Sequence, residues 1–176
     1  AGLRALGACK TLTELNMFGA HEAGPDFVAA LPKDLQRLEV CADYTDRFCT
    51  AVRQHLTRLR HICVAACYRI TDAGLAELCA MPSLRVLDMR QMRGLTAATV
   101  DHLARAVQLE ELDVRHCDFV TTAHVTRLRR ALPKLTRLQS NFTDEEIAES
   151  NHLPNPVQIR TRAELDALPA NTRNVL

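Results

Sequence analysis

The strongest constraint on the fold is a pattern of apolar residues that returns at a fixed interval. Leu59, Ile62, Val64 and Cys67 fit the spacing Leu-x-x-Leu-x-Leu-x-x-Cys. Two further copies follow, each 25 residues after the previous one: Leu84, Leu87, Met89 and Met92, then Leu109, Leu112, Val114 and Cys117. Two equal steps with four matching positions each are unlikely by chance. Such a period is typical of repeat proteins, in which each unit packs against its neighbours.

Each unit predicts a short strand followed by a helix. In the strand half, Ile62 and Val64 alternate with other residues, which is the period of a strand. Three threonines precede the helix halves: Thr71, Thr96 and Thr121. A hydroxyl at that position can accept a hydrogen bond from a first helical N–H, which has no carbonyl partner. Three leucines are expected in equivalent core positions on successive helices: Leu78, Leu103 and Leu128.

Degenerate copies of the pattern begin at Leu12, Leu35 and Leu135. They extend the predicted array over residues 1–143, with a partial first repeat at residues 1–11 and about six strands. The array predicts an α/β solenoid with parallel strands on its concave face and helices on its convex face. Because the chain starts in the helix half of a repeat, we expect the parent protein to continue upstream, with any targeting segment or further domain there.

The period is lost after Thr143, and residues 144–176 are predicted to form a C-terminal cap. Thr143 and Glu146 have the spacing of a capping box, which predicts a short helix from this point. Two further short elements are expected: a strand containing Val157 and Ile159, and a helix from Thr161 to Leu168.

Composition narrows the class of protein. The net charge is +1, from 22 basic and 21 acidic residues, which disfavours binding to nucleic acid or to anionic lipid. No apolar run approaches the ~20 residues of a membrane-spanning helix. Seven cysteines are an odd number, and the start AGLRALGACK does not resemble a signal peptide. We therefore expect reduced thiols in an intracellular protein, located in the cytoplasm or nucleus, with mitochondria as the alternative.

The segment CYRITDAGL, followed by LCAMPSLRVLDM, resembles the cysteine-containing subclass of leucine-rich repeats. Cys67 and Cys117 match the cysteine of that subclass, whereas Met92, Ala20 and Asp43 depart from it. The resemblance implies a right-handed, horseshoe-shaped solenoid that binds another protein. Such repeats occur in F-box and leucine-rich-repeat proteins, which select substrates for cullin–RING ubiquitin ligases, and in antagonist-of-mitotic-exit-network proteins. No F-box lies in these residues.

The resemblance therefore implies a substrate-receptor role only together with an F-box upstream. The alternative is a structural subunit or assembly factor of a multi-subunit complex. Short relatives of the subclass resemble mitochondrial factor B of ATP synthase and respiratory-complex assembly factors.

Residues between the template leucines are expected on the concave face. The pair Asp-x-Arg occurs on two neighbouring strands, flanked by Gln91 and His116. The predicted partner-binding residues on this face are Phe18, Glu39, His61, Asp88, Arg90, Glu111, Asp113 and Arg115. Arginine can form forked bonds with carboxylates of a partner. The alternative interpretation is a solvated face, with exposed ion pairs worth about 0 to 1 kcal/mol each.

A shallow floor of small or weakly polar residues is expected between this charged block and Phe18. Its members are His61, Cys63, Ala65 and Ala66. It can accept a bulky side chain or a helix from another protein. The alternative occupant is an upstream part of the parent chain. Phe142 is expected either at the far end of the row or under the C-terminal cap.

Catalytic and metal chemistry are not indicated. His61, Cys63 and Cys67 are near one another in sequence, but Cys63 is expected to point outward and Cys67 inward, so they do not converge on a metal. Cys117 is expected to be buried and structural, and no third orienting group is evident, so it is a poor nucleophile despite the nearby His116 and His124. The chain has no phosphate loop. We expect no enzymatic activity, no metal and no cofactor.

Overall fold

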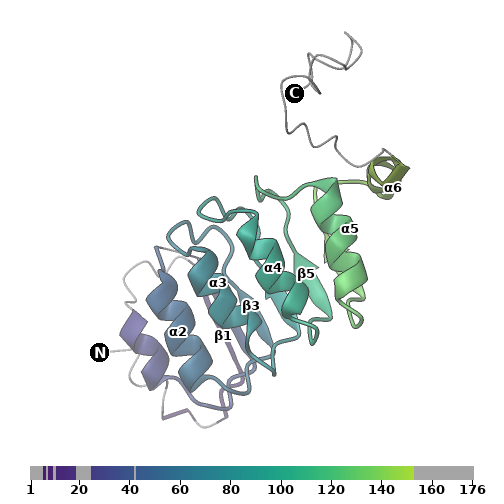
Figure 1. Ribbon diagram of the computed structural model, residues 1–176. Coiled ribbons are helices and arrows are strands. Elements are labelled where there is room, and N and C mark those ends of the chain that lie inside the picture. The colour runs from purple at the N-terminus through teal and green to yellow at the C-terminus, as the bar shows by residue number, and fades with distance from the viewer. Residues whose placement is uncertain (1–5, 7, 10, 19–24, 42, 153–176) are drawn as a thin grey trace.

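Six short strands alternate with helical segments along the chain. The computed structural model describes residues 6, 8, 9, 11–18, 25–41 and 43–152. The strands are β1 (Glu14–Phe18), β2 (Arg37–Cys41), β3 (His61–Cys63), β4 (Val86–Asp88), β5 (Glu111–Asp113) and β6 (Arg137–Gln139). The helices are the 3-10 helix η1 (Pro25–Ala30) and the α-helices α2 (Asp46–His55), α3 (Asp72–Cys79), α4 (Ala98–Arg105), α5 (Thr122–Ala131) and α6 (Asp144–His152). Figure 1 shows α2 to α5 side by side in chain order.

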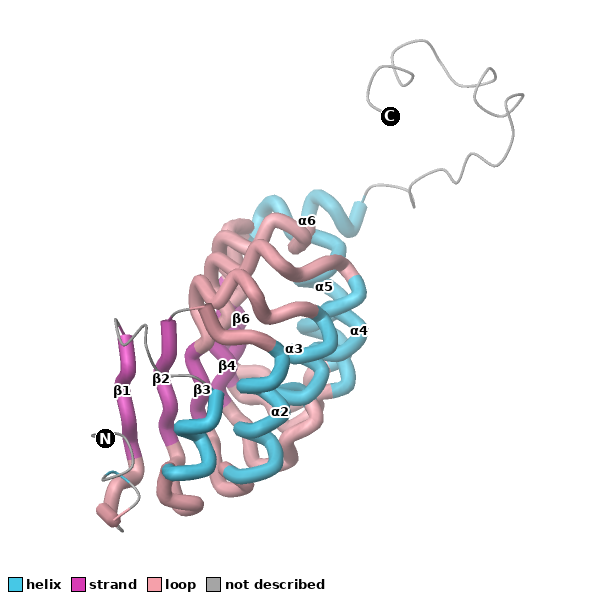
Figure 2. The backbone as a smooth tube through the Cα atoms, turned by 90° about the vertical axis from the view of Figure 1, so that its left-hand side faces the viewer, coloured by secondary structure: helices cyan, strands magenta, loops and turns pink. Residues whose placement is uncertain are grey.

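The strands form one parallel sheet in the order β1 to β6. Ile62 lies opposite Leu87 in the register, and Leu87 lies opposite Leu112, as the repeat predicts. Figure 2 shows the strands along one side of the molecule and the helices along the other. This α/β arrangement confirms the predicted alternation of parallel strands and helices, and it fits a repeat solenoid.

The apolar positions of the repeat pack into one core between the sheet and the helices. Leu59, Ile62, Val64 and Cys67 are 0% exposed, and the matching residues of the next two units are also buried. The predicted helix leucines are fully buried as well: Leu78, Leu103 and Leu128. Because burial of one such side chain is worth about 1.5–3 kcal/mol, this spine is the main source of stability.

Threonine hydroxyl groups lie at the starts of three helices, as predicted. The hydroxyl oxygens of Thr71, Thr96 and Thr121 each accept a hydrogen bond from a backbone N–H at the start of α3, α4 and α5, at 3.3, 3.2 and 3.3 Å. Each bond satisfies a donor that the helix itself leaves without a partner.

Carboxylates join one helix start to the next. Asp46, the first residue of α2, accepts hydrogen bonds from the backbone N–H and the hydroxyl of Thr71 at 2.8 and 2.7 Å. Asp72 accepts equivalent bonds from Thr96 at 3.0 and 2.6 Å, and a third from the hydroxyl of Thr99, which is fully buried. Burial by itself raises the pKa of Asp72, but these hydrogen bonds outweigh it and hold that pKa below its usual range.

The second unit departs from the repeat at the position that corresponds to Cys67 and Cys117. Asp43 is exposed, and the neighbouring Tyr44 is buried in its place. The Tyr44 ring packs against Phe27 and Phe48, with ring centroids 6.0 and 4.5 Å apart. A carboxylate in this apolar layer would lose its hydration without gaining a partner, whereas an aromatic ring gains buried area there.

The capping box at the start of α6 is confirmed. The N–H of Glu146 donates to Thr143 Oγ1 at 3.2 Å, and the N–H of Thr143 donates to Glu146 Oε2 at 2.7 Å. Ile147 is buried against the array, and Phe142 is half-buried against the same core. The boundary at residue 143 stays a prediction, and the elements expected after residue 152 lie outside the described residues.

Candidate functional site

The face of the sheet opposite the helices, here called the open face, carries the predicted partner-binding residues. One column crosses it in register: Asn16, Glu39, Cys63, Asp88, Asp113 and Gln139. Successive strands lie about 4.8 Å apart, so neighbouring residues of this column lie side by side.

The two Asp-x-Arg pairs fold back on their own strands. Arg90 Nε and Nη2 donate to the carboxylate of Asp88 at 2.9 and 2.7 Å, and Arg115 Nε and Nη2 donate to Asp113 at 3.0 and 2.6 Å. Arg90 Nε also lies 3.4 Å from Asp113 Oδ2, which links the pairs into one network. The aspartate side chains are only 16% and 11% exposed, so the network is more buried than a solvated face of exposed ion pairs.

This network stabilises the ionised form of the Asp88 carboxylate. Burial by itself raises its pKa, but the hydrogen bonds and the charge of Arg90 outweigh burial and hold the pKa of Asp88 below its usual range. The side chains of Arg90 and Arg115 are 39% and 36% exposed, so both guanidinium groups remain accessible from solvent. Each arginine is thus fixed in direction by an aspartate and still open to a ligand.

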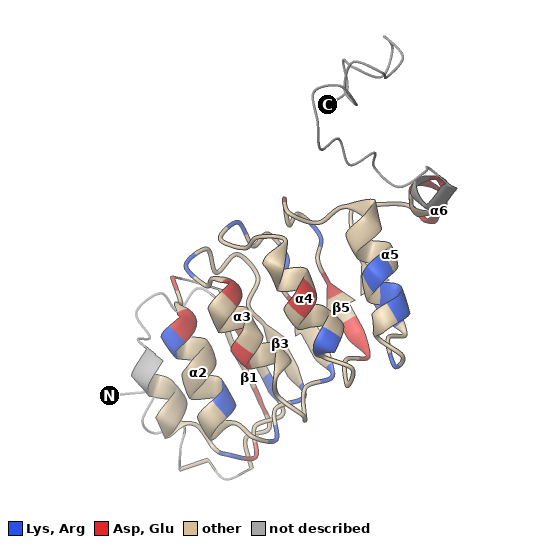
Figure 3. Ribbon diagram, viewed as in Figure 1, with Lys and Arg blue, Asp and Glu red and all other residues tan. Residues whose placement is uncertain are grey.

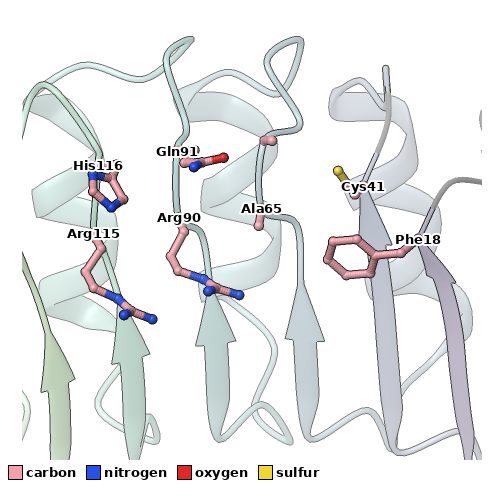
Figure 4. A pocket seen from close by; sticks show the side chains of 8 residues that line it. Phe18, Cys41, Ala65, Arg90, Gln91, Arg115 and His116 are labelled. Atoms are coloured by element: carbon pink, nitrogen blue, oxygen red, sulfur yellow. The ribbon is translucent and has the colours of Figure 1, made fainter.

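A cavity of about 300 Å³, here called the basic hollow, lies beyond the carboxyl ends of the strands. Its apolar side is formed by Phe18, Cys41, Ala65 and Ala66. Its polar side is formed by Arg90, Gln91, Arg115 and His116. Phe18 and Cys41 end β1 and β2, and the other lining residues follow the ends of β3, β4 and β5. Figure 4 shows the guanidinium groups of Arg90 and Arg115 leaning toward the side where Phe18 lies.

Three residues of the basic hollow have a left-handed backbone. Ala66, Gln91 and His116 have φ of 58°, 59° and 58°. They lie one repeat apart and immediately precede the inward residue of each unit. Residues other than glycine adopt this conformation infrequently because Cβ approaches the backbone. Ala66 was expected in the shallow floor, and Gln91 and His116 beside the Asp-x-Arg pairs; their left-handed backbone was not predicted, although their common spacing of 25 residues was available in the sequence.

A second, smaller cavity of about 170 Å³, here called the acidic hollow, lies on the open face along β4 and β5, with further lining residues from β3 and β6. Its charged and titratable lining residues are His61, Asp88, Glu111, Asp113 and Arg137. Burial, aided by the charge of Arg37, lowers the pKa of His61. Because His61 is therefore neutral at pH 7, carboxylates dominate this hollow.

The predicted residues are thus divided between two places. Phe18, Arg90 and Arg115 line the basic hollow, whereas His61, Asp88, Glu111 and Asp113 line the acidic one. Glu39 lines neither: it accepts hydrogen bonds from Arg37 Nε at 2.8 Å and from Asn16 Nδ2 at 2.7 Å. Arg137, whose Nη1 lies 3.8 Å from Glu111 Oε2, was not predicted.

Cys63 points outward from the core, as predicted, because its side chain faces the open side of the sheet beside Glu39 and Asp88. The residue is nevertheless only 3% exposed. Burial, with a smaller contribution from Asp88, raises the pKa of the Cys63 thiol to about 12. Burial likewise raises the pKa of Cys117 to about 11. Both thiols are therefore protonated at neutral pH.

Neither a metal cluster nor a membrane span occurs in the part of the chain that the structure describes. There, no group of three His, Cys, Asp or Glu side chains is placed to hold a metal ion. The described helices are all too short or too polar to cross a bilayer.

Fold and site together define an α/β repeat solenoid with a hollowed open face. No family model matches the chain. The chain is 35% identical over 102 residues to antagonist of mitotic exit network protein 1 of Eremothecium gossypii. The matched region covers 55% of this chain and 26% of that relative. The chain thus spans about a quarter of the length of this curated relative.

Solved structures share the fold at low sequence identity. A chain in the crystal structure of the Rad7 and Elc1 complex from yeast superposes with a TM-score of 0.63 and 20% identity, covering 90% of this chain and 42% of that one. The tropomodulin C-terminal domain of Caenorhabditis elegans gives a TM-score of 0.50 and 17% identity, covering 85% of this chain and 88% of that one. These likenesses concern the fold alone.

Proposed function

We propose that this chain is a non-enzymatic protein-interaction module that binds a partner through its open face. The observation that carries the proposal is the basic hollow, in which two accessible guanidinium groups stand beside an apolar surface. Interfaces are enriched in arginine and aromatic residues, and Phe18 and the two arginines supply both.

The Asp–Arg network prepares these arginines for binding. A guanidinium carries five N–H donors, and the aspartate bonds use Nε and Nη2 of each arginine. A partner carboxylate can therefore bind at Nη1 while the aspartate keeps the side chain in place. Less conformational entropy is lost on binding when a long side chain is already fixed.

The protonated state of Cys63 and Cys117 supports the non-enzymatic part of the proposal, because a thiol nucleophile requires the thiolate. The burial of five of the seven cysteines suits a reducing compartment. We accordingly place the protein in the cytoplasm or nucleus, with mitochondria as the alternative.

We also propose the finer architecture that the repeat resemblance implies, a right-handed, horseshoe-shaped solenoid of cysteine-containing leucine-rich repeats. The parallel order of the strands supports it, because crossover connections between parallel strands are right-handed in about 98% of cases.

Within this class, the first role to test is the substrate receptor of an F-box-type ubiquitin ligase. The similarity to an antagonist of the mitotic exit network, and to a chain solved together with Elc1, is compatible with a role in protein complexes. The alternative remains a structural subunit or assembly factor. Affinity capture of the protein with mass spectrometry separates them: a ligase adaptor supports the receptor, and a stoichiometric large assembly without that adaptor supports the subunit.

The open face is tested by reversing its charges. We expect Arg90→Glu with Arg115→Glu to weaken capture of the partner by at least about tenfold, because the partner's carboxylates would then face four acidic side chains. Capture is measured as the amount of partner retained by the immobilised protein. Arg90→Gln with Arg115→Gln should weaken capture in the same direction without placing new charges beside Asp88 and Asp113.

The matched control reverses two charges on the helices. Figure 3 shows basic residues on α4 and α5, and Arg105 and Arg130 are exposed there. Arg105→Glu with Arg130→Glu should leave capture within about twofold of wild type. Equal loss in both double variants, or unchanged capture in a folded open-face variant, would contradict binding through this face.

A further inference from the structure

The basic hollow has an apolar end and a cationic end on different strands. At the apolar end, Phe18 on β1 is 49% exposed, although it is among the largest side chains of the chain. At the cationic end, Arg90 and Arg115 follow β4 and β5. Figure 4 shows Ala65 between the two ends, where a small side chain leaves the cavity open. A ligand that fills the hollow therefore contacts an apolar surface at one end and two cations at the other.

Backbone strain points to the same place. Ala66, Gln91 and His116 keep a left-handed backbone in three successive repeats, and all three line the basic hollow. Glycine adopts this conformation without the Cβ penalty and would serve equally well for the turn alone. Strained residues that persist beside a cavity suggest that their side chains have a use there. Gln91 and His116 add hydrogen-bonding groups to the cationic end.

Charge determines the direction in which an acidic segment can lie. Across the strands, the described lining of the basic hollow includes two arginines and no carboxylate. Along the strands, a segment would run from this hollow toward Asp88, Asp113 and Glu111 of the acidic hollow. Like charges brought together at an interface cost free energy, so a carboxylate-bearing segment is favoured across the strands and disfavoured along them.

The strand spacing then sets the spacing of the ligand's side chains. Neighbouring strands lie about 4.8 Å apart, so three steps from β1 to β4 span about 14 Å and four steps to β5 span about 19 Å. An extended segment rises about 3.3 Å per residue, which corresponds to about four and about six residues. Both intervals are even, so the three side chains point to the same side of an extended segment.

We propose that the basic hollow binds an extended acidic segment of a partner protein, lying across the strands, with an apolar residue at position i and carboxylates at i+4 and i+6. The apolar side chain contacts Phe18, and the carboxylates bind Arg90 and Arg115. This inference rests on the proposed function, which it deepens by stating the chemistry of the partner.

The experiment titrates the whole chain with synthetic peptides and follows their fluorescence anisotropy. The test peptide carries Leu at i and Glu at i+4 and i+6 in a glycine–serine background. One control carries Lys in place of both Glu residues, and another has the same composition with Leu moved next to the first Glu. We expect the test peptide to bind at least about tenfold more tightly than either control, and Phe18→Ala to remove most of the difference between the two Glu peptides.

Glycine variants separate binding from structure. We expect Gln91→Gly with His116→Gly to raise the melting temperature, because the left-handed backbone is relaxed, and to weaken binding of the test peptide by at least about threefold. If these residues serve only the turn, stability will rise and binding will not change, which would contradict the proposal. Equal binding of the three peptides, or no binding up to about 1 mM, would also overturn it.

The two proposals fail in different ways. If charge reversal at Arg90 and Arg115 abolishes capture of the partner while the peptides show no preference, the open face binds a partner but not a segment of this kind. If capture is unaffected as well, the proposed function fails with it.

Discussion

Replacing Leu87 by alanine is expected to lower the free energy of unfolding by about 3 kcal/mol, within the range of about 2 to 5 kcal/mol found for buried leucines. Leu87 is 0% exposed and lies between Ile62 and Leu112 in the register of the sheet. Its neighbours on both sides belong to other repeats, so a cavity here weakens two interfaces between units. In a solenoid, stability depends on such interfaces between adjacent units.

The measurement is urea denaturation followed by circular dichroism. Val107→Ala is the matched control, because Val107 is 51% exposed and should change stability by less than about 0.5 kcal/mol. If Leu87→Ala also changed the free energy of unfolding by less than about 0.5 kcal/mol, the apolar residues of the repeat would not form a stabilising core that is continuous across the strands.

Replacing Asp72 by alanine is expected to cost about 2 kcal/mol at pH 7. The variant loses three hydrogen bonds to a charged acceptor, from the backbone and hydroxyl of Thr96 and from the hydroxyl of Thr99. Bonds to charged groups are worth about 1.5–3 kcal/mol each in favourable sites, and partial exposure of Asp72 reduces their sum. The hydroxyl of Thr99 would also stay buried without this acceptor.

The effect of Asp72 should depend on pH in a defined direction. Its pKa is lower in the folded chain than in the unfolded chain, so the unfolded chain takes up the proton more readily. The stabilisation is therefore complete above the unfolded pKa of about 3.9 and is lost as pH falls through the folded value. Asp72→Asn should accordingly differ most from wild type at pH 7 and progressively less below about pH 4.

Asp34→Asn serves as the control for this titration. Asp34 forms an exposed ion pair with Arg58, in which the side chains are 61% and 72% exposed. The loss of such a pair should be small at every pH. A gap between wild type and Asp72→Asn that stays constant down to pH 3 would contradict the assigned role of the carboxylate.

The fold was largely predictable because its determinants are local and repeated. A four-position pattern at steps of 23 to 26 residues sets the strands, their register and the helix leucines, and Thr71 and Thr121 precede helices as expected. The second unit was less predictable, since Tyr44 rather than Asp43 turns inward. There an aromatic cluster with Phe27 and Phe48 overrides the pattern of the repeat.

The site was predictable only in outline. Alternation along the strands placed Arg90 and Arg115 on the open face, but it did not separate the basic hollow from the acidic one. That separation depends on how each arginine folds back on its aspartate, which is a matter of side-chain geometry. The burial of Cys63, which faces the open side of the sheet, was likewise not apparent from this alternation.

The most direct measurement of binding through the open face is amide hydrogen exchange of the protein, alone and with the partner that it captures most abundantly. The proposed binding mode predicts slower exchange in residues 63–66, 88–92 and 113–117, which surround the basic hollow, and little change in α3, α4 and α5. Slower exchange confined to those helices, with residues 88–92 and 113–117 unchanged, would contradict it.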